Sequence, residues 1–540
     1  MPDAIILVGL SGSGKSSVAA AVARRLDRPL IDLDVEIERA EGAHPAELIP
    51  TRGEAVFRAI EAAAVERACT VDGAVIATGG GAVIDPLNRW ALWHAGHVAW
   101  LDAPDEVLLG RLERHQERRP MLAGNALERM VAMRQARARF YRAADDRIDS
   151  TDSVAQVARE VIEAAAGRGA AAGRQRSRRL LDAVVRRDHL MGPDVARVVL
   201  GNQLDERTLH DILAPGSTGT PVVVADRRAA AALPGLMAAL PGERQMRITA
   251  GERQKRLRTL EKLLEAASDM GAERGDAWLG VGGGTATDMV GAAAALYLRG
   301  VNFVAVPTTW LGMTDAAIGG KVAVDLSAAK NAAGAFWPPI AVIGDVATLR
   351  TLPRARRLDG MAESLKCGII GDPQLWQLVE TRGKAALRGD EAARYAIIDR
   401  SVQLKLGVVE RDPFERGERR SLNLGHTLGH ALEIESGYRL PHGMAVVLGL
   451  RAVAHIAQGR GAEPGLAERI DEVVAGLGYE RHRDFDPSAV KQALGRDKKR
   501  SHGRQRWILP MAIGRVVDVD DVDESEVDAA LRAISPQAQR

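Results

Sequence analysis

Cysteine is almost absent from this sequence, which has only Cys69 and Cys367 among 540 residues. Two cysteines cannot build a disulfide framework, and their scarcity suits the reducing cytoplasm. Long apolar runs are also missing, since none approaches the ~20 residues of a membrane-spanning helix. The opening stretch MPDAIILVGLSGSGK has no basic segment before its apolar run, so no secretory signal is expected. We therefore predict a cytoplasmic protein with no membrane partner.

A strong excess of charge of one sign is lacking too. The sequence has 73 basic and 71 acidic residues, a net charge of +2, which argues against nucleic acid as the main partner. Its 46% hydrophobic and 27% charged residues are ordinary for a globular protein. The length exceeds what one hydrophobic core usually serves, so about three domains are expected.

Short apolar runs alternate with helical patterns over residues 1–166. The runs AIILVGL, PLIDLD, AVIATGGG and HVAWLD predict buried strands of a parallel sheet with helices on both faces. The following AGRGAAAGRQRSRR has no apolar periodicity and predicts a linker, which we place at 167–180.

A second α/β region follows over residues 181–352, with TPVVVAD, AWLGVGGG, VNFVAVPTT and IAVIGD as its expected strands. Beyond it the pattern changes to long helical stretches such as Gln374–Leu387 and Leu466–Leu477. A mainly helical domain is therefore expected over residues 353–540. The predicted fold class is α/β, with this helical domain at its end.

The segment GLSGSGKS, Gly9 to Ser16, matches G-x-x-x-x-G-K-[ST] directly after a predicted strand. Its glycines, Gly12 and Gly14 among them, let backbone N–H groups converge on phosphate oxygens. Lys15 would reach the β- and γ-phosphates, and the Ser16 hydroxyl would bind Mg²⁺. A chance glycine-rich turn is the alternative, and the strand–loop–helix context argues against it.

Other residues narrow the nucleotide chemistry. Asp32 and Asp34 lie two residues apart in LIDLD, which predicts one strand face carrying both carboxylates. Arg58, the RRP stretch at residues 118–120 and Arg137 are each ordinary surface arginines when taken alone. Together and in this order, these motifs resemble shikimate kinase across nearly all of residues 1–166. A generic nucleotide kinase would need a base-binding acceptor pocket, for which no motif is found.

The resemblance implies ATP with Mg²⁺ as cofactor and shikimate as substrate. Asp34, which would orient or deprotonate the attacking hydroxyl, is then catalytic with Lys15 and the lid residue Arg119. Asp32 would support Mg²⁺, and Ser17 would join the phosphate loop. The residues implied to hold shikimate are Asp34, Arg58, Arg137, Gly79, Gly80 and Gly81.

In the second half, the glycine run of WLGVGGGTATDMVG is not G-x-G-x-x-G, so alone it is equally compatible with a structural turn. In LNLGHTLGHALE, His426 and His430 stand four residues apart and would share a helix face able to hold one metal ion. Thr427 occupies the place of the glutamate of H-E-x-x-H, which excludes the zinc-protease pattern. A hydrogen-bonded structural role is the alternative for any isolated histidine.

The series VVVAD, GERQK, VPTTWLGMTDAAIGGK, KNAAGAFWPP, GMAESLK, NLGHTLGH, LPHG and GRDKK resembles 3-dehydroquinate synthase over residues 181–540. That resemblance implies a Rossmann-like domain carrying NAD⁺ and a helical domain carrying one Zn²⁺ or Co²⁺. The implied reaction converts 3-deoxy-D-arabino-heptulosonate 7-phosphate to 3-dehydroquinate and phosphate, with NAD⁺ reduced and reoxidised within each turnover.

The family pattern assigns the metal to Glu363, His426 and His442, and leaves His430 as an acid/base group beside it. Lys366, Lys405 and Asp315 are implied to be catalytic. The implied NAD⁺ contacts are Asp226, Glu252, Lys255, Gly283, Gly284, Asp288, Thr308, Thr309, Lys321, Lys330 and Thr351. The implied substrate contacts are Arg299, Lys321, Asn331, Lys366, Arg419, Asn423, Lys498 and Lys499, with Arg299 reaching a neighbouring subunit of a homodimer.

The chain departs from the family pattern at Thr285–Thr287, Val322, Arg356 and Met444. These departures bear on the NAD⁺ contacts and on the residues that orient the metal ligands. The leading hypothesis is a bifunctional enzyme of aromatic biosynthesis. One alternative fuses the kinase to another sugar-phosphate cyclase or a polyol dehydrogenase. Another makes one half non-catalytic, which predicts the loss of key ligands.

Overall fold

The structure is a computed structural model, and it describes residues 4–114, 125–169, 178–186, 195–213, 219–327, 329–496, 500–501 and 504–535. The chain forms two compact units. The first comprises Met1–Val184 and Val198–Leu204, and the second Val185–Arg197 and Asp205–Arg540. In the described part of the chain, the helices are all too short or too polar to span a membrane.

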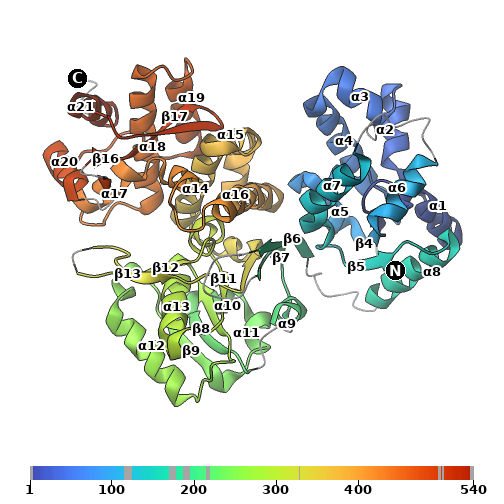
Figure 1. Ribbon diagram of the computed structural model, residues 1–540, viewed down its shortest axis with the longest axis horizontal. Helices are drawn as coiled ribbons and strands as arrows, with labels where there is room; N and C mark the ends of the chain where they lie inside the picture. Colours follow the sequence, from blue (N-terminus) through green and yellow to red (C-terminus); the bar gives the residue numbers. More distant parts are fainter. Residues whose placement is uncertain are drawn as a thin grey trace. The chain divides into compact units, whose positions relative to one another are not determined.

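The first unit contains a five-stranded parallel sheet with strand order β2-β3-β1-β4-β5. Figure 1 shows its strands β4 and β5 among the helices α1 to α8. All five residues of the central strand β1 are apolar and buried, as expected for a strand covered on both faces. Ile5 and Leu7 share a core with α1 and α8 on one face. Its strands and helices are β1 (Ala4–Val8), α1 (Lys15–Leu26), β2 (Leu30–Asp32), α2 (Leu33–Glu41), α3 (Pro45–Arg52), α4 (Glu54–Cys69), β3 (Val75–Ala77), α5 (Pro86–Ala95), β4 (Gly96–Asp102), α6 (Asp105–Glu113), α7 (Ala126–Tyr141), β5 (Asp146–Asp149) and α8 (Val154–Gly169).

A seven-stranded sheet follows, with strand order β6-β7-β14-β11-β10-β8-β9. The strands from β14 to β9 pair in parallel, and β12 and β13 form a separate antiparallel hairpin. The elements of this region are β6 (Arg178–Arg186), β7 (Val195–Asn202), α9 (Glu206–Leu213), β8 (Val222–Asp226), α10 (Arg227–Ala232), α11 (Pro234–Ala238), β9 (Gln245–Ile248), α12 (Leu257–Asp269), β10 (Trp278–Gly282), α13 (Gly284–Leu296), β11 (Phe303–Pro307), the π-helix η7 (Gly312–Ala316), β12 (Lys321–Val324), β13 (Ala333–Phe336) and β14 (Ala341–Asp345).

The remainder of the second unit is mainly helical, as the sequence predicts. In α14, every residue from 359 to 370 is buried, so the polar side chains of this stretch lie inside the protein. The elements are α14 (Arg354–Gly371), α15 (Pro373–Arg388), α16 (Glu391–Arg411), the 3₁₀-helix η9 (Glu418–Asn423), α17 (His426–Glu435), α18 (His442–Gly459), α19 (Leu466–Leu477), α20 (Pro487–Arg496), β15 (Arg500–Ser501), β16 (Arg504–Gln505), β17 (Trp507–Ala512), β18 (Arg515–Val519) and α21 (Glu524–Ala533).

The α/β fold class is confirmed, and a strand lies in each of the eight expected segments, although β2 covers only Leu30–Asp32 and is not buried as predicted. The linker differs at both ends. Helix α8 continues to Gly169, and β6 already begins at Arg178, so secondary structure enters the segment predicted as 167–180. Arg178 is buried, and its guanidinium lies 3.6 Å from the Asp145 carboxylate. Both residues belong to the first unit, so the start of β6 packs within that unit.

Candidate active sites

The first candidate site lies at the carboxyl ends of β1 and β3, which are neighbours in the sheet. Gly12 and Gly14 have φ angles of +86° and +87°, which glycine adopts without strain. Helix α1 begins at Lys15 without a side-chain cap, so the N–H groups of its first turn remain available to an anion. Lys15 is buried and donates to the carbonyls of Gly9 and Leu10 at 3.0 and 2.9 Å. This is the geometry of a phosphate-binding loop.

Asp32 and Asp34 do not share a strand face, so that prediction was wrong. Strand β2 ends at Asp32, and Asp34 lies in the first turn of α2. The Asp32 carboxylate accepts the Asp34 N–H at 3.1 Å and caps the helix. Aspartate is a preferred capping residue, which explains why the helix starts here. Ser16 and Ser17, in the first turn of α1, are exposed.

The glycine run after β3 brings the predicted acceptor-binding residues together. A Cβ atom on Gly79 would lie 3.0 Å from a carboxylate oxygen of Asp34. A Cβ atom on Gly81 would lie 2.6 Å from the Arg58 guanidinium. Glycine therefore leaves the space that these two side chains occupy.

Arg137 and Tyr141 of α7 both donate to the Gly80 carbonyl, at 3.0 and 2.6 Å. Burial raises the pKa of Tyr141 to about 12, so its hydroxyl remains a donor. Sequence reasoning missed Tyr141 and also Glu61, whose buried carboxylate lies 2.7 Å from Arg58. Burial raises the pKa of Glu61, and Arg58 opposes that shift. The spacing of Arg58 and Glu61, three residues apart on a predicted helix, could have indicated this ion pair.

The second candidate site starts at the carboxyl ends of β8, β10 and β11. Gly283 precedes α13, and a Cβ atom there would lie 3.1 Å from the Thr309 side chain. Asp226 ends β8 and caps α10. Thr308 is buried directly after β11, and Gly284 opens α13. These residues form a glycine-lined strand–helix turn of the kind that receives a dinucleotide.

Other residues predicted to contact NAD⁺ also come together. Lys255 donates to the Asp288 carboxylate at 2.6 Å and to the Asn331 amide oxygen at 2.5 Å. Burial raises the pKa of Asp288 to about 6, although Lys255 opposes the shift. The ammonium of Lys330 lies 3.4 Å from the Glu252 carboxylate.

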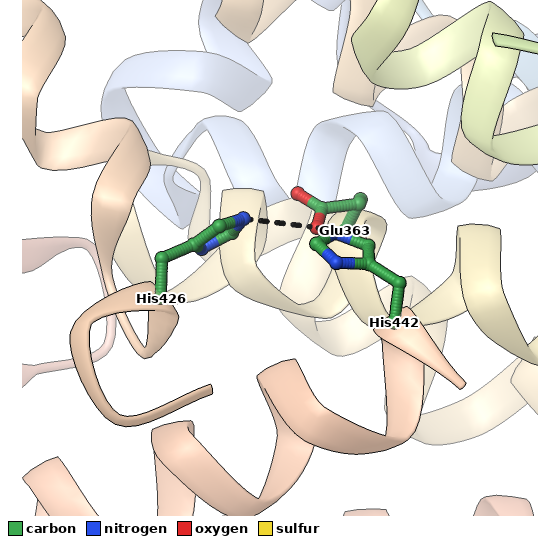
Figure 2. A group of neighbouring side chains, drawn as sticks. All are labelled: Glu363, His426 and His442. Carbon is green, nitrogen blue, oxygen red and sulfur yellow. Dashed lines mark hydrogen bonds and ion pairs between the residues drawn. The ribbon is translucent and has the colours of Figure 1, made fainter. Parts of the chain in front are cut away.

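Glu363, His426 and His442 converge from the three helices α14, α17 and α18, as Figure 2 shows. The Nε2 atoms of His426 and His442 lie 3.4 and 3.2 Å from the same Oε1 of Glu363. Around a tetrahedral ion with bonds of about 2.0–2.2 Å, neighbouring ligand atoms are about 3.3–3.6 Å apart. The two distances to Glu363 are close to this spacing, and the ligand atoms of all three residues lie within 4.8 Å of one another, so the group could hold one metal ion.

The orientation of the two imidazoles supports this fit. Nδ1 of His426 lies 3.1 Å from the Leu424 carbonyl, and Nδ1 of His442 lies 3.6 Å from the Glu433 carboxylate. Both partners accept hydrogen bonds. With the hydrogen of each imidazole on Nδ1, the Nε2 atoms of both rings would be left as ligands for a cation beside Glu363. One carboxylate and two neutral imidazoles suit Zn²⁺ or a similar divalent ion.

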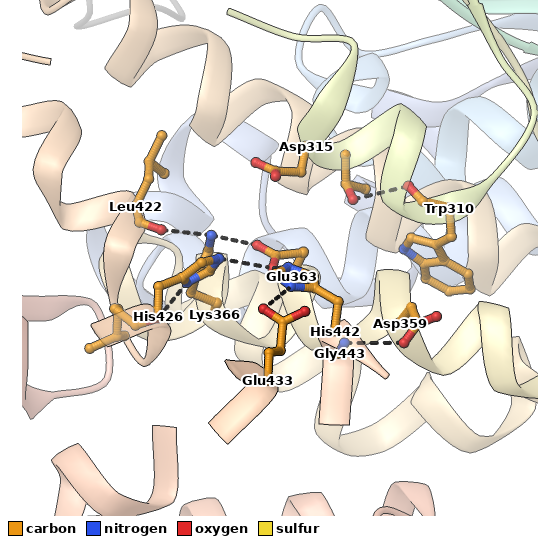
Figure 3. Close-up of polar contacts among 12 residues, drawn as sticks. Trp310, Asp315, Asp359, Glu363, Lys366, Leu422, His426, Glu433, His442 and Gly443 are labelled. Atoms are coloured by element: carbon orange, nitrogen blue, oxygen red, sulfur yellow. Dashed lines mark hydrogen bonds and ion pairs between the residues drawn. The ribbon is translucent and has the colours of Figure 1, made fainter. Parts of the chain in front are cut away.

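The charges around Glu363 agree with this arrangement. Burial opposes the ionisation of Glu363, but Lys366 and both histidines outweigh it and hold the pKa of this carboxyl well below its usual range. Lys366 contacts Glu363 and donates to the Leu422 carbonyl at 2.7 Å (Figure 3). Burial lowers the pKa of His442, but Glu363 and Glu433 overcome that effect and raise it to about 10.

His430 shares α17 with His426, and their ring centroids are 5.3 Å apart. Two groups of three potential metal ligands occur among the described residues: Glu363, His426 and His442, and His430, Glu433 and His442. Neither group contains both histidines of α17. The i, i+4 pair therefore does not present its donor atoms to a common point in the described structure.

A further ion pair lines the region between η7 and α16. Lys405 of α16 contacts both the carboxylate and the carbonyl of Asp315. Burial opposes ionisation of Asp315, but Lys405 outweighs it and lowers the pKa of this carboxyl to about 2. Burial lowers the pKa of Lys405. The structure thus brings together two residues that are 90 positions apart.

Glu415, which sequence reasoning missed, connects two predicted substrate residues. Its carboxylate contacts Lys321 and accepts the Asn423 amide N–H at 2.7 Å. Arg419 is buried and donates to the Gly319 carbonyl at 3.0 Å. Glu415 stands in a loop with no motif of its own, so the sequence offered no signal for it.

Two further predicted site residues are exposed in the described part of the chain. Arg299 is exposed, with a φ of +65°, and Thr351 is exposed and donates to the Thr348 carbonyl at 3.2 Å. Three predicted residues, namely Arg119, Lys498 and Lys499, lie outside the described residues.

Comparison with known proteins connects these sites to families. Residues 245–359 match the N-terminal and residues 360–500 the C-terminal model of 3-dehydroquinate synthase. A 3-dehydroquinate synthase from Xanthomonas campestris pv. campestris is 41% identical over 293 residues, covering 52% of this chain and 78% of that relative. The chain belongs to the 3-dehydroquinate synthase family. Residues 11–166 match the shikimate kinase model, so a shikimate kinase domain precedes the synthase.

Two solved structures of synthases share the fold of the second half of this chain. A 2-epi-5-epi-valiolone synthase from Streptomyces hygroscopicus subsp. jinggangensis 5008, with NAD⁺ and Zn²⁺ bound, is 28% identical with a TM-score of 0.58. The matched region covers 64% of this chain and 98% of the valiolone synthase chain. A 2-deoxy-scyllo-inosose synthase is 22% identical with a TM-score of 0.56, covering 65% of this chain and 99% of its own. The second likeness concerns the fold alone.

Proposed function

We propose that this chain is a bifunctional enzyme of aromatic amino acid biosynthesis that combines shikimate kinase with 3-dehydroquinate synthase. The observation that carries the synthase half is the convergence of Glu363, His426 and His442 at the spacing of metal ligands. The phosphate loop beside Asp34 and the glycine run carries the kinase half. We place the kinase at residues 1–166, the NAD⁺ domain at 181–352 and the metal domain at 353–540.

In the kinase, ATP would lie on the phosphate loop, with Mg²⁺ held by Ser16 and, through water, by Asp32. The ion neutralises phosphate charge when it is bound. Asp34 would orient the shikimate hydroxyl, and Arg58 with Arg137 would pair with the shikimate carboxylate, which a planar guanidinium fits in bidentate geometry. Arg119 would close over the phosphates.

In the synthase, NAD⁺ would lie along the turn between β10 and α13. It supplies the acceptor, and later the donor, of a hydride. Asp226 at the end of β8 would receive the adenosine ribose hydroxyls, which a carboxylate at a strand end binds in such folds. The cluster of Lys255, Asp288 and Asn331 would fix the loop beside the dinucleotide.

Glu363, His426 and His442 would hold Zn²⁺ or Co²⁺. The ion acidifies a substrate hydroxyl when it is bound, which assists oxidation at that carbon. His430 would move a proton at the edge of this site. The substrate phosphate and carboxylate would be held by a basic set of side chains, namely Lys321, Lys366, Lys405, Arg419, Lys498 and Lys499.

We further propose a homodimer in which Arg299 reaches the partner's site, because this arginine is exposed and lies apart from the clusters described above. A cytoplasmic location is proposed as well. Cys69 and Cys367 are free thiols, the state that a reducing compartment maintains.

The choice of substrate for the synthase half has a specific competitor, since a valiolone synthase shares the fold at 28% identity. The higher identity of 41% to a 3-dehydroquinate synthase favours the heptulosonate phosphate. A purified full chain should release phosphate from 3-deoxy-D-arabino-heptulosonate 7-phosphate and phosphorylate shikimate with ATP. Chelation should abolish only the first activity when Mg²⁺ is supplied in excess to the kinase. Absence of phosphate release from the heptulosonate phosphate by the folded, metal-loaded chain would contradict the proposal.

A further inference from the structure

Glu433 is a buried carboxylate in the last turn of α17, and no family motif considered above gives it a role. Its Oε2 lies 3.6 Å from Nδ1 of His442, and its Oε1 lies 3.3 Å from the ammonium of Lys330. Figure 3 shows Glu433 on the side of the His442 ring away from Glu363. The Glu433 side chain therefore stands between a cation and an imidazole nitrogen.

The two nitrogens of His442 have different partners. Nε2 lies 3.2 Å from Glu363, and in the described part of the chain Glu433 is the recorded partner of Nδ1. At 3.6 Å this is an ion-pair contact, longer than a direct hydrogen bond. Its charge nevertheless favours the tautomer with hydrogen on Nδ1, because a carboxylate stabilises a nearby N–H dipole. That tautomer turns the Nε2 lone pair toward His426 and Glu363.

We infer that Glu433 is the positioning residue that sets the tautomer and ring orientation of His442 as a metal ligand. Metal-bound histidines generally donate their second N–H to a carboxylate or carbonyl, which increases their basicity and fixes the ring. The ammonium of Lys330, 3.3 Å from Oε1 of Glu433, holds the other end of this carboxylate and fixes its position beside His442. The inference rests on the proposed metal role of Glu363, His426 and His442.

Direct binding of the ion by Glu433, with His430 and His442, is the competing arrangement. Two observations favour the positioning role. The distances of 3.4 and 3.2 Å from Glu363 Oε1 to the two Nε2 atoms are close to tetrahedral edges of about 3.3–3.6 Å, and His426 is buried beside Glu363. A single ion takes only one nitrogen of His442, and Nε2 is the nitrogen that faces this better-formed group.

The test is the Zn²⁺ affinity of the full chain, measured by competition with a chromophoric chelator. Glu433→Gln keeps the shape and removes the charge, and it should weaken Zn²⁺ binding by about 10–100-fold. Glu433→Asp, which retains the carboxylate, should lose less than Glu433→Gln. Glu435→Gln is the matched control, because this carboxylate lies on the same helix and accepts the Asp486 N–H at 3.2 Å. It should bind Zn²⁺ as the wild type does.

Shikimate kinase activity and the thermal transition of the second unit establish that each variant is folded. Equal Zn²⁺ affinity of Glu433→Gln and wild type would overturn the inference. A loss as complete as that of His426→Ala would overturn it as well, since it would make Glu433 a ligand. If the wild type bound no Zn²⁺, or His426→Ala bound it unchanged, the proposed metal site itself would fail.

Discussion

Lys366 supplies the positive charge that keeps Glu363 ionised inside the protein, and its removal has a calculable cost. The side chains of Lys366 and Glu363 are 2% and 1% exposed, and they form an ion pair. Lys366 also donates to the Leu422 carbonyl at 2.7 Å. Lys366→Met retains most of the side-chain volume and removes the charge, so Glu363 stays buried without this partner.

Breaking a buried ion pair by removing one partner costs about 3–5 kcal/mol, because the other charge remains desolvated. A domain of 150–250 residues loses about 2–4 °C of its transition temperature for each kcal/mol. The second unit is larger, so the lower value of roughly 2 °C applies and a loss of about 6–10 °C is expected.

Differential scanning calorimetry of the full chain measures this change. Shikimate with ATP and Mg²⁺ should raise only the transition of the kinase unit, which identifies the transition of the second unit. Lys491→Met is the matched control, since Lys491 pairs with Glu524 and Asp528 at 2.9 and 3.0 Å on the surface. Exposed pairs contribute little, so the control should melt with the wild type. If Lys366→Met melted like this control, the account of a buried compensated carboxylate would be refuted.

Three further predictions concern other residues. Burial raises the pKa of Asp288 to about 6, so the folded state binds more protons than the unfolded state between about pH 4 and 6. The contribution of Asp288 to the free energy of unfolding should therefore fall as pH rises through this window. Asp288→Asn should remove this pH dependence when the free energy is measured by urea titration at several pH values. An unchanged pH dependence in the variant would contradict the prediction. Glu61→Gln should raise the KM for shikimate roughly tenfold, because the charge that orients Arg58 is lost. The KM for ATP should stay constant. Equal changes in both KM values would count against this role of Glu61. Burial raises the pKa of Cys69 to about 11 and that of Cys367 to about 12. Neither thiol should therefore react with an aromatic disulfide reagent at pH 8 until the protein is unfolded. Rapid labelling of the folded chain would contradict this prediction.

The elements that the sequence predicted share a local signal. Strands β1, β10 and β11 are continuous apolar runs that end in glycine or polar residues, so their position and burial follow from the sequence alone. The phosphate loop is equally local, because Gly12, Gly14 and Lys15 act through backbone geometry within a few residues.

The errors have local causes as well. The pattern PLIDLD suggested a strand through Asp34, yet Asp32 caps a helix that starts at the next residue. An alternating run of four to six residues does not distinguish a strand from a capped helix, since aspartate suits both the strand end and the cap. The short antiparallel strands β12 and β13, of four residues each, were also missed.

The partners of the site residues were beyond prediction because they depend on tertiary packing. Glu433 meets Lys330, which is 103 residues away, and Lys321 meets Glu415, which is 94 residues away. No periodicity or spacing encodes such contacts. The motif residues themselves were found, since their chemistry is written in short segments, but the residues that orient them were not.

The most direct test of the account is a reciprocal pair of variants in the full chain, assayed for both activities in one preparation. Asp34→Asn should abolish ATP-dependent phosphorylation of shikimate and leave phosphate release from the heptulosonate phosphate at the wild-type rate. His426→Ala should abolish that phosphate release, together with Zn²⁺ binding, and leave the kinase rate unchanged. Loss of both activities in either folded variant, or retention of the synthase rate in His426→Ala, would contradict two separate sites of which one depends on a metal.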